Sequence, residues 1–282
     1  MATARKEMAK TMAKVDMIIE VLDARLPGAS SNPLIKELRD HRQRPSLKVL
    51  NKSDLADPAA TAEWLRAFEA QPLTKAIAIS SKRATDVAKL PRLAASMVPH
   101  RDSTLKPVRI MVVGIPNVGK STLINALLKR RVAGVGDEPG ITKNQARFEI
   151  NNRMELIDTP GLLWPAIRLP SDGLILAASH AIGVNAYIDE EVATYLADVL
   201  LARCPRTLCA RYKLVSAPSD GPSMIEAIAK QRGLRTRGDN LDLEKAALVL
   251  LKDYRSGALG PISLETPATR ALQLSEAADQ HL

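Results

Sequence analysis

The stretch of sequence that decides the fold is GIPNVGKS, residues 114–121. It has the P-loop pattern G-x-x-x-x-G-K-S and lies between the apolar run RIMVV (109–113) and the helical pattern TLINALLK (122–129). In such a setting of strand, loop and helix, backbone N–H groups and a helix N-terminus bind phosphate together. The stretch therefore predicts a nucleotide site, and a glycine-rich turn without a ligand is the disfavoured alternative.

Roles within this loop follow from side-chain chemistry. Lys120 is expected to reach the β- and γ-phosphates and to act in catalysis by neutralising charge. Ser121 is expected to bind Mg²⁺ through its hydroxyl. Nucleotide contacts are predicted for six consecutive residues: Asn117, Val118, Gly119, Lys120, Ser121 and Thr122.

Four more apolar runs are separated by segments of helical periodicity. They are MIIEVLD (17–23), LKVLN (47–51), AIAIS (76–80) and MELID (154–158). Strands that alternate with helices predict an α/β fold with a mainly parallel sheet, and ligands bind such sheets at the carboxyl ends of the strands.

The motif NKSD, residues 51–54, follows one of these strands and predicts which base is bound. A carboxylate at Asp54 can accept hydrogen bonds from N1–H and the 2-amino group of guanine, which adenine does not offer. Asn51 is expected to hold the loop and touch the base, and the aliphatic stem of Lys52 to cover its face. NKSD alone is also compatible with a helix cap. The SSK motif after the next strand favours the guanine site and adds three contacts: Ser80, Ser81 and Lys82.

The motif DTPG, residues 158–161, ends the last apolar run and has the form of a nucleotide switch. Asp158 is expected to meet Mg²⁺, and the Gly161 amide to meet the γ-phosphate during catalysis. Thr142, in PGIT, is the candidate that completes the Mg²⁺ shell and the catalytic set. The sequence therefore predicts binding of GTP or GDP with Mg²⁺.

The order of these motifs is unusual, because the base-reading elements precede the P-loop. Joining the old ends of a domain and opening a new break preserves the site, since domain termini often lie close together. We therefore predict a circularly permuted GTP-binding domain over residues 1–170. Helical patterns dominate afterwards, so residues 171–282 are predicted to form a small all-helical domain with a loose tail after about residue 260.

The composition of the chain limits the kinds of partner that it is expected to bind. The formal charge of +9 favours a polyanion, whereas aromatic residues at 3% argue against base-stacking platforms. No apolar run approaches the roughly 20 residues that span a bilayer, and the N-terminus lacks a signal-type apolar core, so a cytoplasmic protein is expected. The two cysteines, Cys204 and Cys209, are expected to be ordinary reduced thiols.

These motifs together resemble the circularly permuted GTPases of the YlqF/RbgA type, the ribosome biogenesis GTPase A family, over nearly the whole chain. The resemblance also covers DARLPGASSNP (23–33) and DTPGLLWP (158–165). It implies a GTPase that acts in late assembly of the large ribosomal subunit. The implied partners are the subunit precursor and its rRNA, with no membrane and no DNA, and we expect a monomer.

The resemblance also bears on the rate of hydrolysis. Leu162 stands where Ras-like enzymes carry a water-orienting Gln. The family is thought to use a His upstream of a Met-Ala pair instead, and Met1 aligns immediately after that position. We therefore expect slow turnover by this chain alone, and the alternative function is a nucleotide-gated RNA- or protein-binding switch with little intrinsic hydrolysis.

Two further expectations concern ions and RNA. Asn117 is shared with potassium-activated GTPases, in which this side chain helps to bind K⁺; a polar residue that fits a tight turn is the alternative. Two basic groups are candidates for rRNA contact, although solvated helix faces often look the same. They are Arg203, Arg206, Arg211 and Lys213, and then Lys230, Arg232, Arg235 and Arg237.

Overall fold

The computed structural model describes residues 2–101, 105–130, 146–159, 167, 169–183 and 186–279, without the side chains of residues 2–4 and 7. The chain forms two compact units. Unit 1 comprises Met1–Ala166 together with Glu265–Leu282, and unit 2 comprises Ile167–Leu264.

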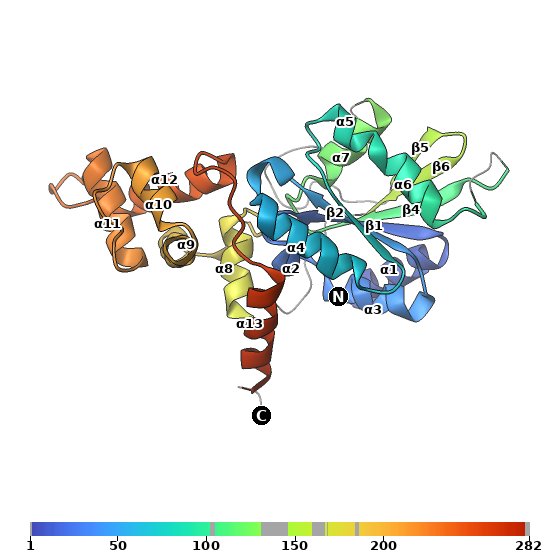
Figure 1. Cartoon of the computed structure of the whole chain (residues 1–282), viewed down its shortest axis with the longest axis horizontal. Coiled ribbons are helices and arrows are strands. Elements are labelled where there is room, and N and C mark those ends of the chain that lie inside the picture. Colours follow the sequence, from blue (N-terminus) through green and yellow to red (C-terminus); the bar gives the residue numbers. More distant parts are fainter. Residues whose placement is uncertain are drawn as a thin grey trace. The chain divides into compact units, whose positions relative to one another are not determined.

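Unit 1 is built on a six-stranded sheet with the strand order β3-β2-β1-β4-β6-β5 (Figure 1). Every neighbouring pair is parallel except β5 with β6, so the predicted mainly parallel sheet is confirmed. The strands are β1 (Met17–Asp23), β2 (Ser46–Asn51), β3 (Thr74–Ala78), β4 (Val108–Val113), β5 (Ala146–Asn151) and β6 (Met154–Asp158).

Strand β5 is the one strand of the described sheet that the apolar runs did not predict. Its sequence, ARFEIN, alternates between half-buried and exposed positions, in contrast to the continuously buried β1 and β2. An antiparallel strand at the edge of a sheet commonly has one solvent-exposed face, so its sequence lacks a continuous apolar run.

Helices flank the sheet of unit 1, and several of them join its strands (Figure 1). They are α1 (Ala2–Ala13), α2 (Pro27–Ser30), α3 (Pro33–Arg42), α4 (Pro58–Glu69), α5 (Ala84–Val87), α6 (Lys89–Met97) and α7 (Lys120–Leu128), with a short 3₁₀ turn at Ser53–Leu55. Helix α13 (Pro267–Asp279) has no buried residue and makes its main contact with α4, not with the sheet. The starts of α3 and α4 are encoded locally. Asn32 and Asp57 accept hydrogen bonds from backbone N–H groups of the first turn, and a proline follows each of them.

The core of unit 1 includes a cluster in which α1 and α3 pack against the sheet. Met8 and Met12 of α1 lie with Ile35 of α3 against strand residues such as Ile18 and Met111, all at most 4% exposed. A second cluster joins Trp64 and Phe68 of α4 to the ends of β1 and β2. These apolar contacts hold the strands whose carboxyl ends carry the motifs.

Unit 2 is helical, as predicted for this part of the chain. Its longer helices are α8 (Pro170–Ala178), α9 (Asp189–Arg203), α10 (Pro205–Tyr212), α11 (Gly221–Arg232) and α12 (Leu243–Ser256). Helix α9 packs against each of the other four. Gly221 permits one of these contacts, since a Cβ there would lie 2.3 Å from the Thr194 carbonyl oxygen of α9.

The chain after residue 260 differs from the prediction of a loose tail within the helical domain. Residues Glu265–Leu282 belong to unit 1, and Pro267–Asp279 form α13. Glu265 is 1% exposed. Its Oε1 accepts hydrogen bonds from the backbone N–H groups of Gly28 and Ala29, and its backbone oxygen accepts one from Trp64 Nε1 at 3.3 Å. These partners are more than 200 residues away in sequence, so the polar, alanine-rich composition of the tail could not reveal them.

Candidate nucleotide-binding site

The P-loop follows β4 and ends at the N-terminus of α7. Asn117 and Gly119 both have positive φ, 59° and 91°. Left-handed residues within such a loop allow successive backbone N–H groups to face one side, which is how phosphate-binding loops are built. Gly114 allows the start of the loop to pass close to the backbone of β1, because a Cβ at this position would lie 2.7 Å from the Val21 carbonyl oxygen.

The side chain of Asn51 joins the three predicted motifs that stand at the carboxyl ends of β2, β3 and β4. Its Nδ2 donates a hydrogen bond of 2.8 Å to the Val118 carbonyl oxygen in the P-loop. Its Oδ1 accepts hydrogen bonds from the backbone N–H of Ser81 at 3.0 Å and from the Ser81 hydroxyl at 2.8 Å. Asn51 is 2% exposed, so these bonds form away from water and hold together the loops that are predicted to bind the base and the phosphates.

Lys120 lies at the bottom of the loop, 6% exposed, against the end of the neighbouring strand β6. Its Nζ is 2.5 Å from Asp158 Oδ1 and also donates a hydrogen bond to the Thr159 carbonyl oxygen. Burial raises the pKa of the Asp158 carboxyl, and the Lys120 ammonium opposes that rise. An ammonium and a carboxylate therefore meet where phosphate and Mg²⁺ are predicted to bind.

The NKSD segment leaves β2 through a strained residue. Lys52 has φ +61°, and Asp54 lies in the 3₁₀ turn that follows. The Lys52 ammonium is 2.8 Å from Asp23 Oδ2, at the end of the adjacent strand β1. Asp23 also binds the buried guanidinium of Arg25.

The structure brings most of the predicted site residues to one edge of the sheet. Ser80, Ser81 and Lys82 follow β3, the NKSD motif follows β2 and the P-loop follows β4, so these elements lie at the carboxyl ends of strands in one sheet. Thr142 and Gly161 lie outside the described residues, so their predicted roles stay predictions.

Asp23 was quoted within the resemblance but was not predicted as a site residue. The signal that could have found it is its position, because it ends a strand as the NKSD and DTPG motifs do. Its pairing with Lys52 needed the strand order, which places β1 between β2 and β4.

Comparison with known proteins identifies the family. A family model described as 50S ribosome-binding GTPase matches residues 109–204. Ribosome biogenesis GTPase A of Bacillus cereus is 36% identical over 274 residues, which cover 95% of this chain and 92% of that protein. The chain belongs to the ribosome biogenesis GTPase A family. Mitochondrial ribosome-associated GTPase 1 of Mus musculus is 32% identical, over 94% of this chain and 88% of that protein.

Solved structures share the fold of this family member. GDP-bound YlqF has a TM-score of 0.67 at 23% identity, over 93% of this chain and 99% of that chain. GNP-bound YlqF from T. maritima has a TM-score of 0.65 at 24% identity, over 94% and 98% of the two chains. The predicted circular permutation agrees with this likeness.

Membership of the ribosome biogenesis GTPase A family makes this chain a GTPase that binds guanine nucleotides, and Mg²⁺ is the ion that GTPases typically use. Two described residues, Ser121 and Asp158, carry the kind of ligand that Mg²⁺ prefers, which is an oxygen atom. Ser121 stands in the first turn of α7, and Asp158 ends the neighbouring β6, opposite Val112 of β4. Both oxygen donors are therefore at the phosphate end of the site.

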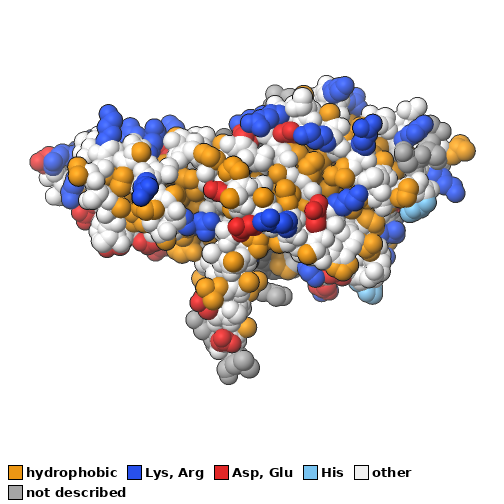
Figure 2. All heavy atoms as spheres, viewed as in Figure 1, with side chains coloured by type: hydrophobic (Ala, Val, Ile, Leu, Met, Phe, Trp, Pro, Cys, Tyr) orange, Lys and Arg blue, Asp and Glu red, His pale blue; other side chains and the backbone are white. Residues whose placement is uncertain are grey.

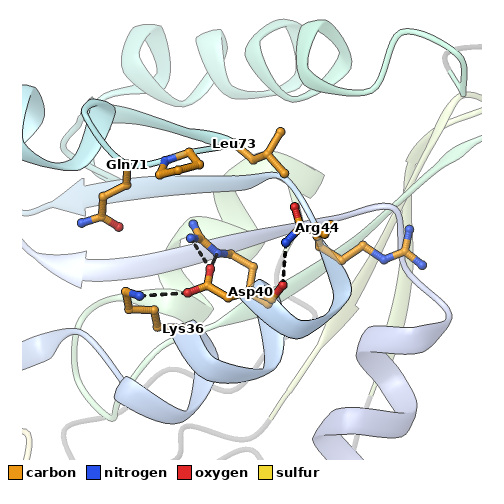
Figure 3. A pocket seen from close by; sticks show the side chains of 8 residues that line it. Lys36, Asp40, Arg44, Gln71 and Leu73 are labelled. Atoms are coloured by element: carbon orange, nitrogen blue, oxygen red, sulfur yellow. Dashed lines mark hydrogen bonds and ion pairs between the residues drawn. The ribbon is translucent and has the colours of Figure 1, made fainter.

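A separate cavity of about 290 Å³ lies at the other ends of the strands. Its lining includes residues just before β2 and β3, so it is distinct from the nucleotide site. Within it, the Asp40 carboxylate pairs with Lys36 and Arg39 (Figure 3). One carboxylate is shared by these two cations, so the lining, which also includes Arg44, keeps a net positive charge. No residue of the predicted nucleotide motifs lines this cavity, and we assign it no ligand.

Proposed function

We propose that this chain is a GTPase that acts in late assembly of the large ribosomal subunit. The observation that carries the proposal is the Asn51 side chain, which bonds to the P-loop at one end and to Ser81 at the other. A guanine-type motif is thereby joined to a phosphate-binding loop in one site. The names of the relatives, ribosome biogenesis GTPase A and mitochondrial ribosome-associated GTPase, support the ribosomal partner.

Within this proposal each motif has one task. Asp54 selects guanine through its carboxylate, and Lys52 covers the face of the base. The backbone of residues 117–121 binds the phosphates, and the remaining base-side contacts come from Ser80, Ser81 and Lys82. Ser121, Thr142 and Asp158 would hold Mg²⁺, which when bound neutralises charge on the phosphates.

Hydrolysis in this scheme is an in-line attack of water on the γ-phosphate. Lys120 neutralises the negative charge that spreads over the phosphate oxygens in the transition state, and its buried position strengthens that effect. The Gly161 amide would bind the γ-phosphate. Thr142 would complete the catalytic set through its hydroxyl.

The partner in this proposal is the precursor of the large subunit, bound through its rRNA. Lys and Arg side chains gather along the upper edge of unit 2 in the view of Figure 2. Phosphate contacts by such side chains provide affinity without base stacking. We propose that the protein acts in the cytoplasm as a monomer and that neither a membrane nor DNA is its partner. Among the described helices, none is long and apolar enough to cross a bilayer.

The test of this function is GTP turnover with and without immature large subunits. We expect slow hydrolysis by the chain alone and at least about tenfold stimulation by the particles, because docking orders the catalytic groups. Small ribosomal subunits serve as the control and should stimulate little. A chain that binds GTP but hydrolyses it equally slowly with every particle would instead support the second candidate, a nucleotide-gated switch, which is favoured by Leu162 in place of a water-orienting Gln.

A second arm of the same assay locates the RNA contact. The residues changed to Gln are Lys230, Arg232, Arg235 and Arg237. We expect weaker co-sedimentation with large subunits and a shallower dependence on salt, since fewer counterions are released. GTP affinity should stay unchanged, as these residues lie in unit 2. Unchanged co-sedimentation at moderate salt would exclude this group as the anchor.

We also propose that Asn117 binds K⁺ beside the phosphates. The left-handed backbone at Asn117, φ 59°, sets this side chain within the phosphate-binding loop. Turnover is expected to be several-fold faster in K⁺ than in Na⁺, and Asn117→Ser is expected to remove the difference. Equal rates in the two salts for the unaltered chain would contradict this role.

A further inference from the structure

Asp23 lies beside the predicted nucleotide site without belonging to any of its motifs. It ends β1, is 1% exposed, and lies in register with Asn51 of β2. A carboxylate that is so deeply buried needs charged partners, because desolvation of an isolated charge is costly. We therefore expect Asp23 to be paired with cationic side chains.

Two cations share this carboxylate. Arg25 donates from Nε to Asp23 Oδ1 at 2.9 Å and from Nη2 to Oδ2 at 2.8 Å, and it is itself 2% exposed. The Lys52 ammonium approaches the same Oδ2 at 2.8 Å. Burial by itself would raise the pKa of Asp23, but Arg25 and Lys52 bring that pKa well below its usual range. Asp23 is therefore an anion that holds two cations together.

Lys52 depends on this anion for its position. Its backbone is in the left-handed region, which is uncommon for a residue with a side chain. Its side chain is tied at the far end by Asp23, so the four-carbon stem is held between two fixed points. Without the carboxylate, Arg25 and Lys52 would be neighbouring like charges that repel each other.

We propose that Asp23 is a positioning residue for base recognition, which holds the Lys52 stem in the place where it covers the face of the guanine ring. This inference rests on the proposed function, because it requires guanine to bind beside NKSD. Asp23 itself need not touch the nucleotide. We therefore expect Asp23 to affect how tightly the base is bound. The selection of guanine depends on Asp54, and the chemistry at the phosphates depends on the P-loop and the switch residues.

The first measurement is the affinity of Asp23→Asn for GTP, GDP and ITP, by titration with Mg²⁺ present. We expect all three dissociation constants to rise by a similar factor, roughly 5- to 20-fold, since covering of the base is lost for each. The ratio of GTP to ITP affinity should stay that of the unaltered chain. Turnover at saturating GTP should stay within about twofold, so the effect appears in KM and leaves kcat unchanged.

The second measurement is a double-mutant cycle with Lys52→Met, which keeps an apolar stem but removes the ammonium. Lys52→Met alone should lose affinity to about the same extent as Asp23→Asn. In that background Asp23→Asn should cost nothing further, because there is no ammonium left to hold. A purely structural role for Asp23 would give the opposite result, with the two losses adding.

A matched control is Asp253→Asn in unit 2. Asp253 also accepts two bonds from an arginine, Arg211, at 2.8 Å each, and is 8% exposed. It should lower stability without changing nucleotide affinity. Unaltered affinity in Lys52→Met would overturn the proposal even if Asp23→Asn failed to fold, and so would additive losses in the cycle. Failure of the unaltered chain to bind GTP would instead refute the proposed function.

Discussion

Asp54→Asn is expected to lower the affinity for GTP by at least about 100-fold and to raise the affinity for XTP. In the proposed site the carboxylate would accept two hydrogen bonds from guanine, from N1–H and the 2-amino group, whereas the Asn amide offers one acceptor and one donor. The amide NH₂ would face the guanine amino group, and a polar group left without a partner costs far more than a weakened bond. Xanthine carries a carbonyl at that position, so it complements Asn.

The measurement is competitive binding of GTP, XTP and ATP to the two proteins. Asp57→Asn is the control, since Asp57 lies three residues away and caps α4 through its side-chain bond to the Ala60 N–H. Asn caps helices as well as Asp does, so nucleotide preference should not change. If Asp54→Asn retained its preference for GTP over XTP, Asp54 would not be the residue that reads the base.

Gly119→Ala is expected to abolish nucleotide binding at concentrations that saturate the unaltered chain. Gly119 has φ +91°, and a Cβ there would lie 2.2 Å from Asn51 Nδ2. The methyl group and the amide cannot both keep their places. Asn51 must therefore release the Val118 carbonyl oxygen or the loop must shift, and either change separates the base-reading motif from the phosphate-binding loop. A combined loss of about 100-fold or more follows from misplacement of the phosphate-binding backbone.

Gly233→Ala separates this collision from backbone strain. Gly233 also has positive φ, 60°, but a Cβ there would meet nothing within 4 Å. It should therefore show only the modest destabilisation of an Ala in the left-handed region, about 1 kcal/mol in urea unfolding, with GTP affinity unchanged. Equal nucleotide affinities for Gly119→Ala and the unaltered chain would show that the Asn51 link is not needed for binding.

Much of the fold followed from short-range patterns. The continuous apolar runs before the NKSD motif and the P-loop predicted β2 and β4 to within a residue at each end. The glycines after the basic ends of α11 and α12, Gly233 and Gly257, have the left-handed backbone expected of helix C-caps. Such signals are readable because the chain forms each of these elements from neighbouring residues.

Other features were not readable in this way. Strand β5 lacks an apolar run because only one of its faces is covered, and it pairs on one side alone. The segment at Glu265 looks like a polar tail, yet its carboxylate binds backbone N–H groups near residue 28. Its burial depends on a surface of unit 1 that is assembled from distant parts of the chain.

The P-loop is where the two kinds of information meet. Its residue spacing alone was enough to predict a phosphate-binding loop that contains Lys120 and Ser121, because that chemistry is built within eight consecutive residues between a strand and a helix. Only the tertiary structure decided that Asn51 bonds to this loop and that Asp23 holds Lys52. Those contacts depend on which strands are neighbours and in what register, and strand order is set by packing of the whole sheet, to which no local pattern corresponds.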